Sequence, residues 1–251
     1  MSVMARAGTP AKDACAPKDL NLNPVIAGRL SRDGAVFGQD GVVDIAVSLV
    51  ESYLRLNGYL TLSEFEIQSR AADGTFETVT DIDIMGIRFP GDVYAGDPHD
   101  GGEARLLLLS DDALRLVEGQ IDVIVGEVKQ GFVEFNPGIR RRDVLHQILR
   151  RVQWLFESDL DEVVRRLVKD GVCTVPARGG GTARVRLVAF GQAPGSDVHT
   201  ITHAHIVKTL LRFFSGEEHA FRPAQFSSPA PAMLSLLLKS GFELEGGRGD
   251  G

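Results

Sequence analysis

The segment Gln120–Gln130, QIDVIVGEVKQ, restricts the fold of this chain more than any other stretch. It is dense in β-branched apolar residues, a composition that favours a strand buried on both faces. Such a strand needs other structure packed on each side of its sheet. The segment therefore predicts an interior strand of a layered domain.

The patterns around this strand predict an α/β order. Alternation of apolar and polar residues predicts strands over Tyr59–Gln68, Phe76–Phe89 and Ala183–Phe190, with a turn at 71–74 (AADG). Apolar residues at helical spacing predict helices over 42–56, over 144–168 with a break near 158–159, over 202–214 and over 232–238. The order helix, three strands, helix, strand, helix predicts an α/β fold with a central mixed β-sheet flanked by helices.

Length and composition limit the classes of protein to which the chain can belong. Its 251 residues suffice for one large domain. We expect a loose segment over 1–40, a main domain over 41–214 and a C-terminal extension over 215–251. The net charge of −7 argues against coating nucleic acid by bulk charge, and two cysteines are too few for a disulfide framework. With no apolar run long enough for a bilayer and no secretory signal, we expect a cytoplasmic protein with no membrane partner.

Acidic residues and a lysine share one face of two predicted strands. Side chains two positions apart on a strand point the same way, so Glu127 and Lys129 share a face while Val128 points into the helical layer. By the same rule Asp81 and Asp83 share a face of the preceding strand. If the two strands are neighbours, Asp83 and Glu127 converge.

The opposite face of the preceding strand carries its apolar residues. The alternation in DIDI places Ile82 and Ile84 together, facing the core. The strand is therefore expected to be amphipathic over these four residues.

Converging carboxylates repel each other unless a cation lies between them or one takes a proton. Mg²⁺ is the hard cation that one or two carboxylates, with water and a phosphate oxygen, bind well, and Mn²⁺ accepts the same ligands. A neighbouring lysine such as Lys129 can orient or help to deprotonate an attacking water, or offset transition-state charge. The pattern thus predicts a metal-dependent site for phosphate chemistry.

These residues, together with the predicted order of elements, resemble the PD-(D/E)xK nuclease superfamily, whose core is restriction-endonuclease-like. The resemblance rests on Glu51 in the first helix, Asp83 in TDIDIMGI and Glu127-x-Lys129 in VIVGEVKQG, and it covers about residues 42–214. It implies a Mg²⁺-dependent endonuclease, a hydrolase that cuts DNA or, less in keeping with the type, RNA. The family's proline before the aspartate is absent, which leaves Asp81 open as an alternative ligand to Asp83.

The resemblance also implies a role for each residue. Asp83 and Glu127 would bind the metal together with the carbonyl of Val128, and Glu51 would hold a metal-bound water. Lys129 would act on the attacking water. Gln130 directly follows the motif, and some relatives use a polar residue there.

Basic residues cluster after the third predicted strand. Arg140, Arg141 and Arg142 stand at a predicted helix start, where they could contact nucleic-acid phosphates or form only a solvated helix face. Trp154, the single tryptophan, is expected in the core rather than as a base-stacking platform.

Two other functions remain open at this point. The fold could serve as a non-catalytic interaction or assembly module, or the site could act on a small phosphorylated substrate. A nuclease of this size often works as a homodimer so that both strands are cut, but no interface is apparent in the sequence.

Overall fold

The protein is described by a computed structural model that covers residues 44–91, 94–95, 105–106, 110–132, 136–192, 198–215 and 228–242. By its internal contacts the chain divides into two units, residues 1–42 and residues 43–251. All of the described residues belong to the second unit. No helix among them is long and apolar enough to cross a membrane.

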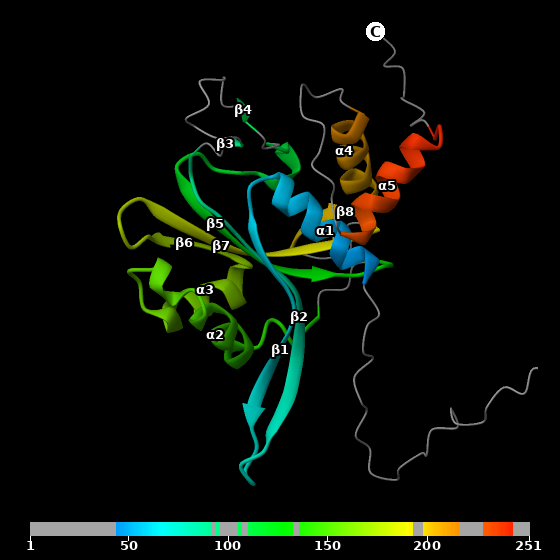
Figure 1. The fold of residues 1–251 in the computed structure, drawn as a ribbon. Coiled ribbons are helices and arrows are strands. Elements are labelled where there is room, and N and C mark those ends of the chain that lie inside the picture. The colour runs from blue at the N-terminus through cyan, green and yellow to red at the C-terminus, as the bar shows by residue number, and fades with distance from the viewer. Residues whose placement is uncertain are drawn as a thin grey trace, which may run out of the picture. The chain divides into compact units, whose positions relative to one another are not determined.

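A mixed sheet of six strands forms the centre of this unit (Figure 1). Its main order is β1 (Leu60–Arg70), β2 (Phe76–Arg88), β5 (Gln120–Val128), β7 (Thr182–Gly191) and β6 (Val172–Pro176). β1, β2 and β5 are successively antiparallel, and β7 runs parallel to β5. β6 and β8 (His199–Thr202) pair with successive parts of β7, antiparallel and parallel. A separate two-stranded pair joins β3 (Tyr94–Ala95) to β4 (Arg105–Leu106).

Helices cover both faces of the sheet, as the buried β5 segment predicts. α1 (Ile45–Leu56), α4 (His203–Ser215) and α5 (Pro229–Lys239) lie on one face. α2 (Arg142–Arg150) and α3 (Leu160–Asp170) lie on the other. Two short 3₁₀ turns, η2 (Asp112–Leu114) and η3 (Gln153–Leu155), complete the described elements. The α/β class and the mixed, helix-flanked sheet are therefore confirmed.

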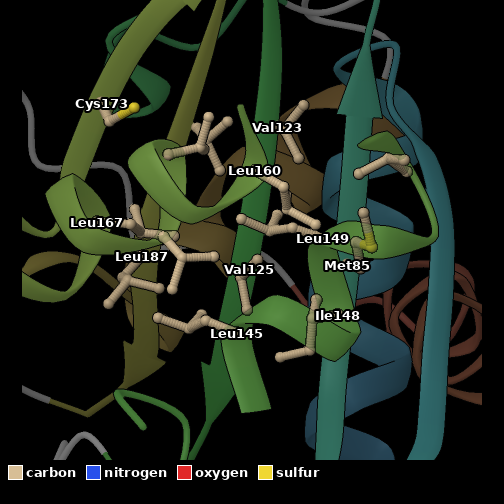
Figure 2. Close-up of a cluster of buried hydrophobic side chains, with 14 of the residues drawn as sticks. Met85, Val123, Val125, Leu145, Ile148, Leu149, Leu160, Leu167, Cys173 and Leu187 are labelled. Carbon is tan, nitrogen blue, oxygen red and sulfur yellow. The ribbon is translucent and has the colours of Figure 1, made fainter. Parts of the chain in front are cut away.

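Two hydrophobic cores lie on opposite faces of β5. The α2–α3 core contains Val123 and Val125, packed with Met85 and Leu145 (Figure 2). The α1–α4 core contains Ile124 and Val128. Because successive residues of β5 alternate between the two cores, Glu127 belongs to the face that carries Val123 and Val125.

Local signals explain most of the element boundaries. The Asp44 carboxylate accepts hydrogen bonds from the first backbone N–H groups of α1, which is the usual role of an N-cap aspartate. The predicted turn joins β1 to β2, with Gly74 at a φ of 90°. The predicted break in the helical region is also present, since α2 and α3 are separate helices. The sequence patterns missed the short strands β6 and β8.

Trp154 contradicts the prediction that it lies in the core. The residue is 55% exposed, whereas its neighbours Val152, Leu155 and Phe156 are buried. The chain forms a 3₁₀ turn at this point instead of continuing α2, and Trp154 consequently lies on the outer side of that turn.

A buried ion cluster ties β5 to β7 near the start of both strands. The Asp122 carboxylate accepts hydrogen bonds from Arg184 Nε at 2.7 Å and from Arg186 Nη2 at 2.8 Å, and the Tyr59 hydroxyl donates to it at 2.5 Å. Burial alone would raise the pKa of Asp122, but the hydrogen bonds from Arg186 and Tyr59 and the charges of Arg186 and Arg184 together outweigh burial and lower it. The cluster therefore neutralises the acidic residue near the start of β5.

Gly126 provides a test of how tightly β2, β5 and β7 pack. A Cβ atom at this position would lie 2.6 Å from Ile84 Cγ2 and 2.9 Å from Phe190 Cε2, both inside van der Waals contact. We expect Gly126→Ala to lower the free energy of unfolding by about 1–3 kcal/mol, measured by denaturant titration. Gly131→Ala is the control, because nothing lies within 4 Å of the added atom. Equal stability of the two variants would contradict this packing.

Candidate functional site

Asp83 lies where β2 separates from β5. The two strands pair from Arg88↔Asp122 to Ile84↔Gly126, and continuation of that register would place Asp83 opposite Glu127. Instead, the Asp83 carboxylate oxygen Oδ2 accepts a hydrogen bond from the backbone N–H of Val128 at 2.6 Å. The side chain therefore satisfies a donor that a continued strand pairing would have used. The convergence of Asp83 with the end of β5 is as the strand alternation predicts.

Glu127 and Lys129 form an ion pair at the end of β5. Lys129 Nζ contacts Glu127 Oε1, which shows that both side chains lie on one side of the strand, as predicted. The Glu127 side chain is 3% exposed, whereas that of Lys129 is 42% exposed. Val128 is buried in the α1–α4 core, also as predicted. The pair thus combines a buried carboxylate with a lysine that solvent and ligands can reach.

Burial and nearby acidic residues disfavour the charged forms of the Asp83 and Glu127 carboxylates. Burial is the largest cause that raises the pKa of Asp83 and of Glu127, and the charge of Asp83 raises the pKa of Glu127 further. Burial also disfavours the charged form of Lys129, but its hydrogen bond and charge interaction with Glu127 outweigh this and raise its pKa. Lys129 is therefore held as an ammonium ion at neutral pH.

Asp81 is near this group, but it is the more exposed of the two aspartates. Its charge contributes to the pKa values of Asp83, Glu127 and Lys129. Asp83 is partly buried and bonds directly to β5, whereas Asp81 is exposed and lies opposite Glu66 on β1. The geometry consequently favours Asp83 as the aspartate of the site.

The prediction that Ile82 and Ile84 share one face is wrong. Both are fully buried, but Ile84 packs in the α1–α4 core and Ile82 in the α2–α3 core. Ile84 still pairs with β5, whereas the pairing has ended before Ile82, and on β1 Glu64 has a φ of 51° opposite this point. The simple alternation fails because the β1–β2 pair is irregular where β2 separates from β5.

Glu51 projects from α1 toward β1. Its Oε1 atom accepts hydrogen bonds from Arg55 at 2.7 Å, Thr61 at 3.0 Å and Ser63 at 3.2 Å. The carboxylate is thus already neutralised and hydrogen-bonded in this arrangement. Its predicted role as a holder of a metal-bound water stays a prediction.

Asp44 is a residue near the site that the sequence reasoning missed. Besides capping α1, its charge raises the pKa of Asp83, so the start of α1 is within electrostatic range of that carboxylate. An aspartate directly before an apolar helical pattern is a recognisable N-cap signal. That signal locates the start of the helix but contains no information on which strand the helix start approaches.

The donor set at the end of β5 fits a hard divalent cation in part. Asp83 and Glu127 supply carboxylate oxygens, the ligand type that Mg²⁺ and Mn²⁺ prefer, and both are destabilised as anions by burial. In the described portion of the chain, no three His, Cys, Asp or Glu side chains are grouped as metal ligands. A cation here would thus depend on two carboxylates, with the predicted Val128 carbonyl and water as its other ligands.

Comparisons with protein-family models, with curated proteins and with solved structures find no significant match to this chain. The resemblance to the PD-(D/E)xK superfamily accordingly rests on the sequence motifs alone.

The three predicted phosphate-binding arginines stand at the start of α2. Arg141 is the N-cap residue and pairs with Asp143 at 2.5 Å. Arg142 is exposed, and Arg140 is partly buried. Gln130 is exposed just after β5. No described contact of these residues tests their predicted roles.

Replacement of Asp83 by asparagine should show the cost of the buried carboxylate. Asparagine keeps an oxygen for the Val128 N–H but carries no charge. The pKa of Asp83 is raised in the folded protein, so the folded state favours the protonated carboxyl. The contribution of Asp83 to the free energy of unfolding is therefore full below its ordinary pKa and is lost as the pH rises through the raised pKa. We expect Asp83→Asn to be as stable as the wild type at about pH 3. From about pH 4 upward it should become progressively more stable than the wild type at the same pH.

Denaturant midpoints over this pH range provide the measurement. Glu77→Gln, an exposed carboxylate on the same strand whose charge does not contribute to the pKa of Asp83, is the matched control and should follow the wild type. A constant difference between Asp83→Asn and the wild type at every pH would count against a buried, destabilised carboxylate.

Proposed function

We propose that the protein is a Mg²⁺-dependent nuclease that hydrolyses phosphodiester bonds of DNA. The observation that carries the proposal is the joining of Asp83 to the end of β5 beside the Glu127–Lys129 pair. A buried and a partly buried carboxylate, both with raised pKa values, and an accessible ammonium group are suited to a cation and a phosphate oxygen.

The order of elements supports a restriction-endonuclease-like core. A helix precedes an antiparallel β1–β2–β5 arrangement. The helical region α2–α3 is followed by the short strand β6 and then by β7, which pairs parallel to β5. This is the order on which the resemblance to the PD-(D/E)xK superfamily rests. Asp83 and the Glu127-Val128-Lys129 motif lie on the second and third strands of that core.

Each side chain has a definite task in the proposed hydrolysis. A bound Mg²⁺ ion would polarise the phosphate and lower the pKa of a coordinated water. Asp83 and Glu127 would hold that ion. Lys129 is better suited to offsetting charge on the attacked phosphate than to removing a proton, since its raised pKa keeps it protonated.

The second candidate is a non-catalytic interaction module with the same fold, and one observation favours it. The Glu51 carboxylate already accepts hydrogen bonds from Arg55, Thr61 and Ser63, so the third acidic residue of the motif has its own partners without a cation. A module of this kind would bind its partner without any requirement for a divalent cation.

Cleavage assays with supercoiled plasmid, linear duplex, single-stranded DNA and RNA test the proposal. The wild type should cut DNA only with Mg²⁺ or Mn²⁺. Lys129→Ala should reduce the rate about 10²–10³-fold, because one charge-stabilising group is removed, and Asp83→Ala should abolish metal-dependent cutting.

Lys208→Ala is the matched control, since Lys208 is an exposed lysine on α4, and it should cut at the wild-type rate. Cutting that survives both site substitutions would place the activity elsewhere. A wild type that cuts none of the substrates would favour the interaction module.

A further inference from the structure

A groove lies between the β1–β2 hairpin and α2. Its volume is about 470 Å³, and its lining comes from β1, from the start of β2 and from the last turn of α2 and the residue that follows it. A volume of this size is typical of a site for one small ligand. It matches the scale of an unstacked nucleotide rather than that of a base-paired helix.

The groove is positively charged. Arg150 and Arg151 line it and are exposed, and neither has a carboxylate partner among the residues that the structure describes. Arg151 lies over the ring of Phe65, with the guanidinium carbon 4.5 Å from the ring centroid, a stacking that leaves its edge N–H groups available. The one acidic lining residue, Glu66, accepts hydrogen bonds from Gln68 and Thr78.

Aromatic and amide groups accompany these arginines. Phe76 is 68% exposed at the start of β2, on the same groove. Gln68 and Gln147 add amide groups that can bond base edges. A basic groove with an exposed aromatic ring is the arrangement that binds single-stranded nucleic acid, because bases stack on the ring while cations hold the phosphates.

The groove lies along the β1–β2 strand pair, and β2 also carries Asp83. The lining residues Ile67 and Gln68 pair with Thr80 and Thr78, which precede Asp83 on β2 by about 10–17 Å at the usual rise per residue. The face occupied by α2 is also the face to which Glu127 belongs. A strand in the groove could therefore continue toward the carboxylate site.

We propose that this groove binds a single-stranded segment of the nucleic-acid substrate, with a base on Phe76 and phosphates on Arg150 and Arg151. This proposal rests on the proposed nuclease function, because it specifies the form of nucleic acid that the nuclease would prefer. The proposal predicts that the preferred substrate carries a single-stranded segment, such as a flap or an overhang, and is not a continuous duplex.

Fluorescence anisotropy with a labelled single-stranded oligonucleotide, in EDTA so that no cutting occurs, tests the groove. The wild type should bind the single strand more tightly than the same sequence as a duplex. Phe76→Leu, which keeps an apolar side chain but loses the aromatic ring, should weaken single-strand binding at least about fivefold. Arg150→Gln should reduce the salt dependence of binding by about 0.7 in the slope of log K against log salt.

Arg178→Gln is the matched control, because Arg178 is exposed in the β6–β7 turn and the charge change is the same. It should leave both the affinity and the salt slope unchanged. Both Phe76 and Arg150 are exposed, so the substitutions should leave the melting temperature unchanged.

Equal losses in Arg150→Gln and Arg178→Gln would overturn the proposal in favour of bulk charge. Tighter binding of the duplex, or no binding of the single strand, would also overturn it. Because binding is measured without metal, groove-dependent binding by a protein that cuts nothing would leave this inference standing and refute only the nuclease function.

Discussion

The hydrogen bond from the Val128 N–H to the Asp83 carboxylate is the interaction on which the candidate site depends. β2 pairs with β5 only as far as Ile84↔Gly126, and beyond that point β2 pairs with β1 alone. Without a replacement acceptor, the Val128 N–H would be buried and unpaired. Asp83 satisfies this donor and is held beside Glu127 by the same bond, so the parting of two strands positions two carboxylates.

Acidic residues at the two ends of β5 differ in how far their charge is neutralised and in the direction of their pKa shifts. Near its start, Asp122 is neutralised by Arg184 and Arg186, and its pKa is lowered. At its end, two carboxylates share one lysine, and the pKa values of both are raised. The first arrangement holds strands together. The second leaves excess negative charge that a divalent cation would relieve, which is typical of sites that give up stability for function.

The sequence predicts the sheet and its acidic face because both follow from residue alternation along continuous strands. The interior position of Gln120–Val128 and the common side of Glu127 and Lys129 are local properties of that kind. The faces of Ile82 and Ile84, the exposure of Trp154 and the partners of Glu51 depend on a strand irregularity, a 3₁₀ turn and a neighbouring strand. Such features arise from tertiary packing, and no periodic pattern encodes them.

Calorimetric titration with Mn²⁺ tests the central claim most directly, namely that Asp83 and Glu127 form a divalent-cation site. The wild type should bind the ion, and both Asp83→Asn and Glu127→Gln should lose that binding while they remain folded. Asp81→Asn should retain it. Equal binding by the wild type and both site variants, or no binding by the wild type, would contradict the account.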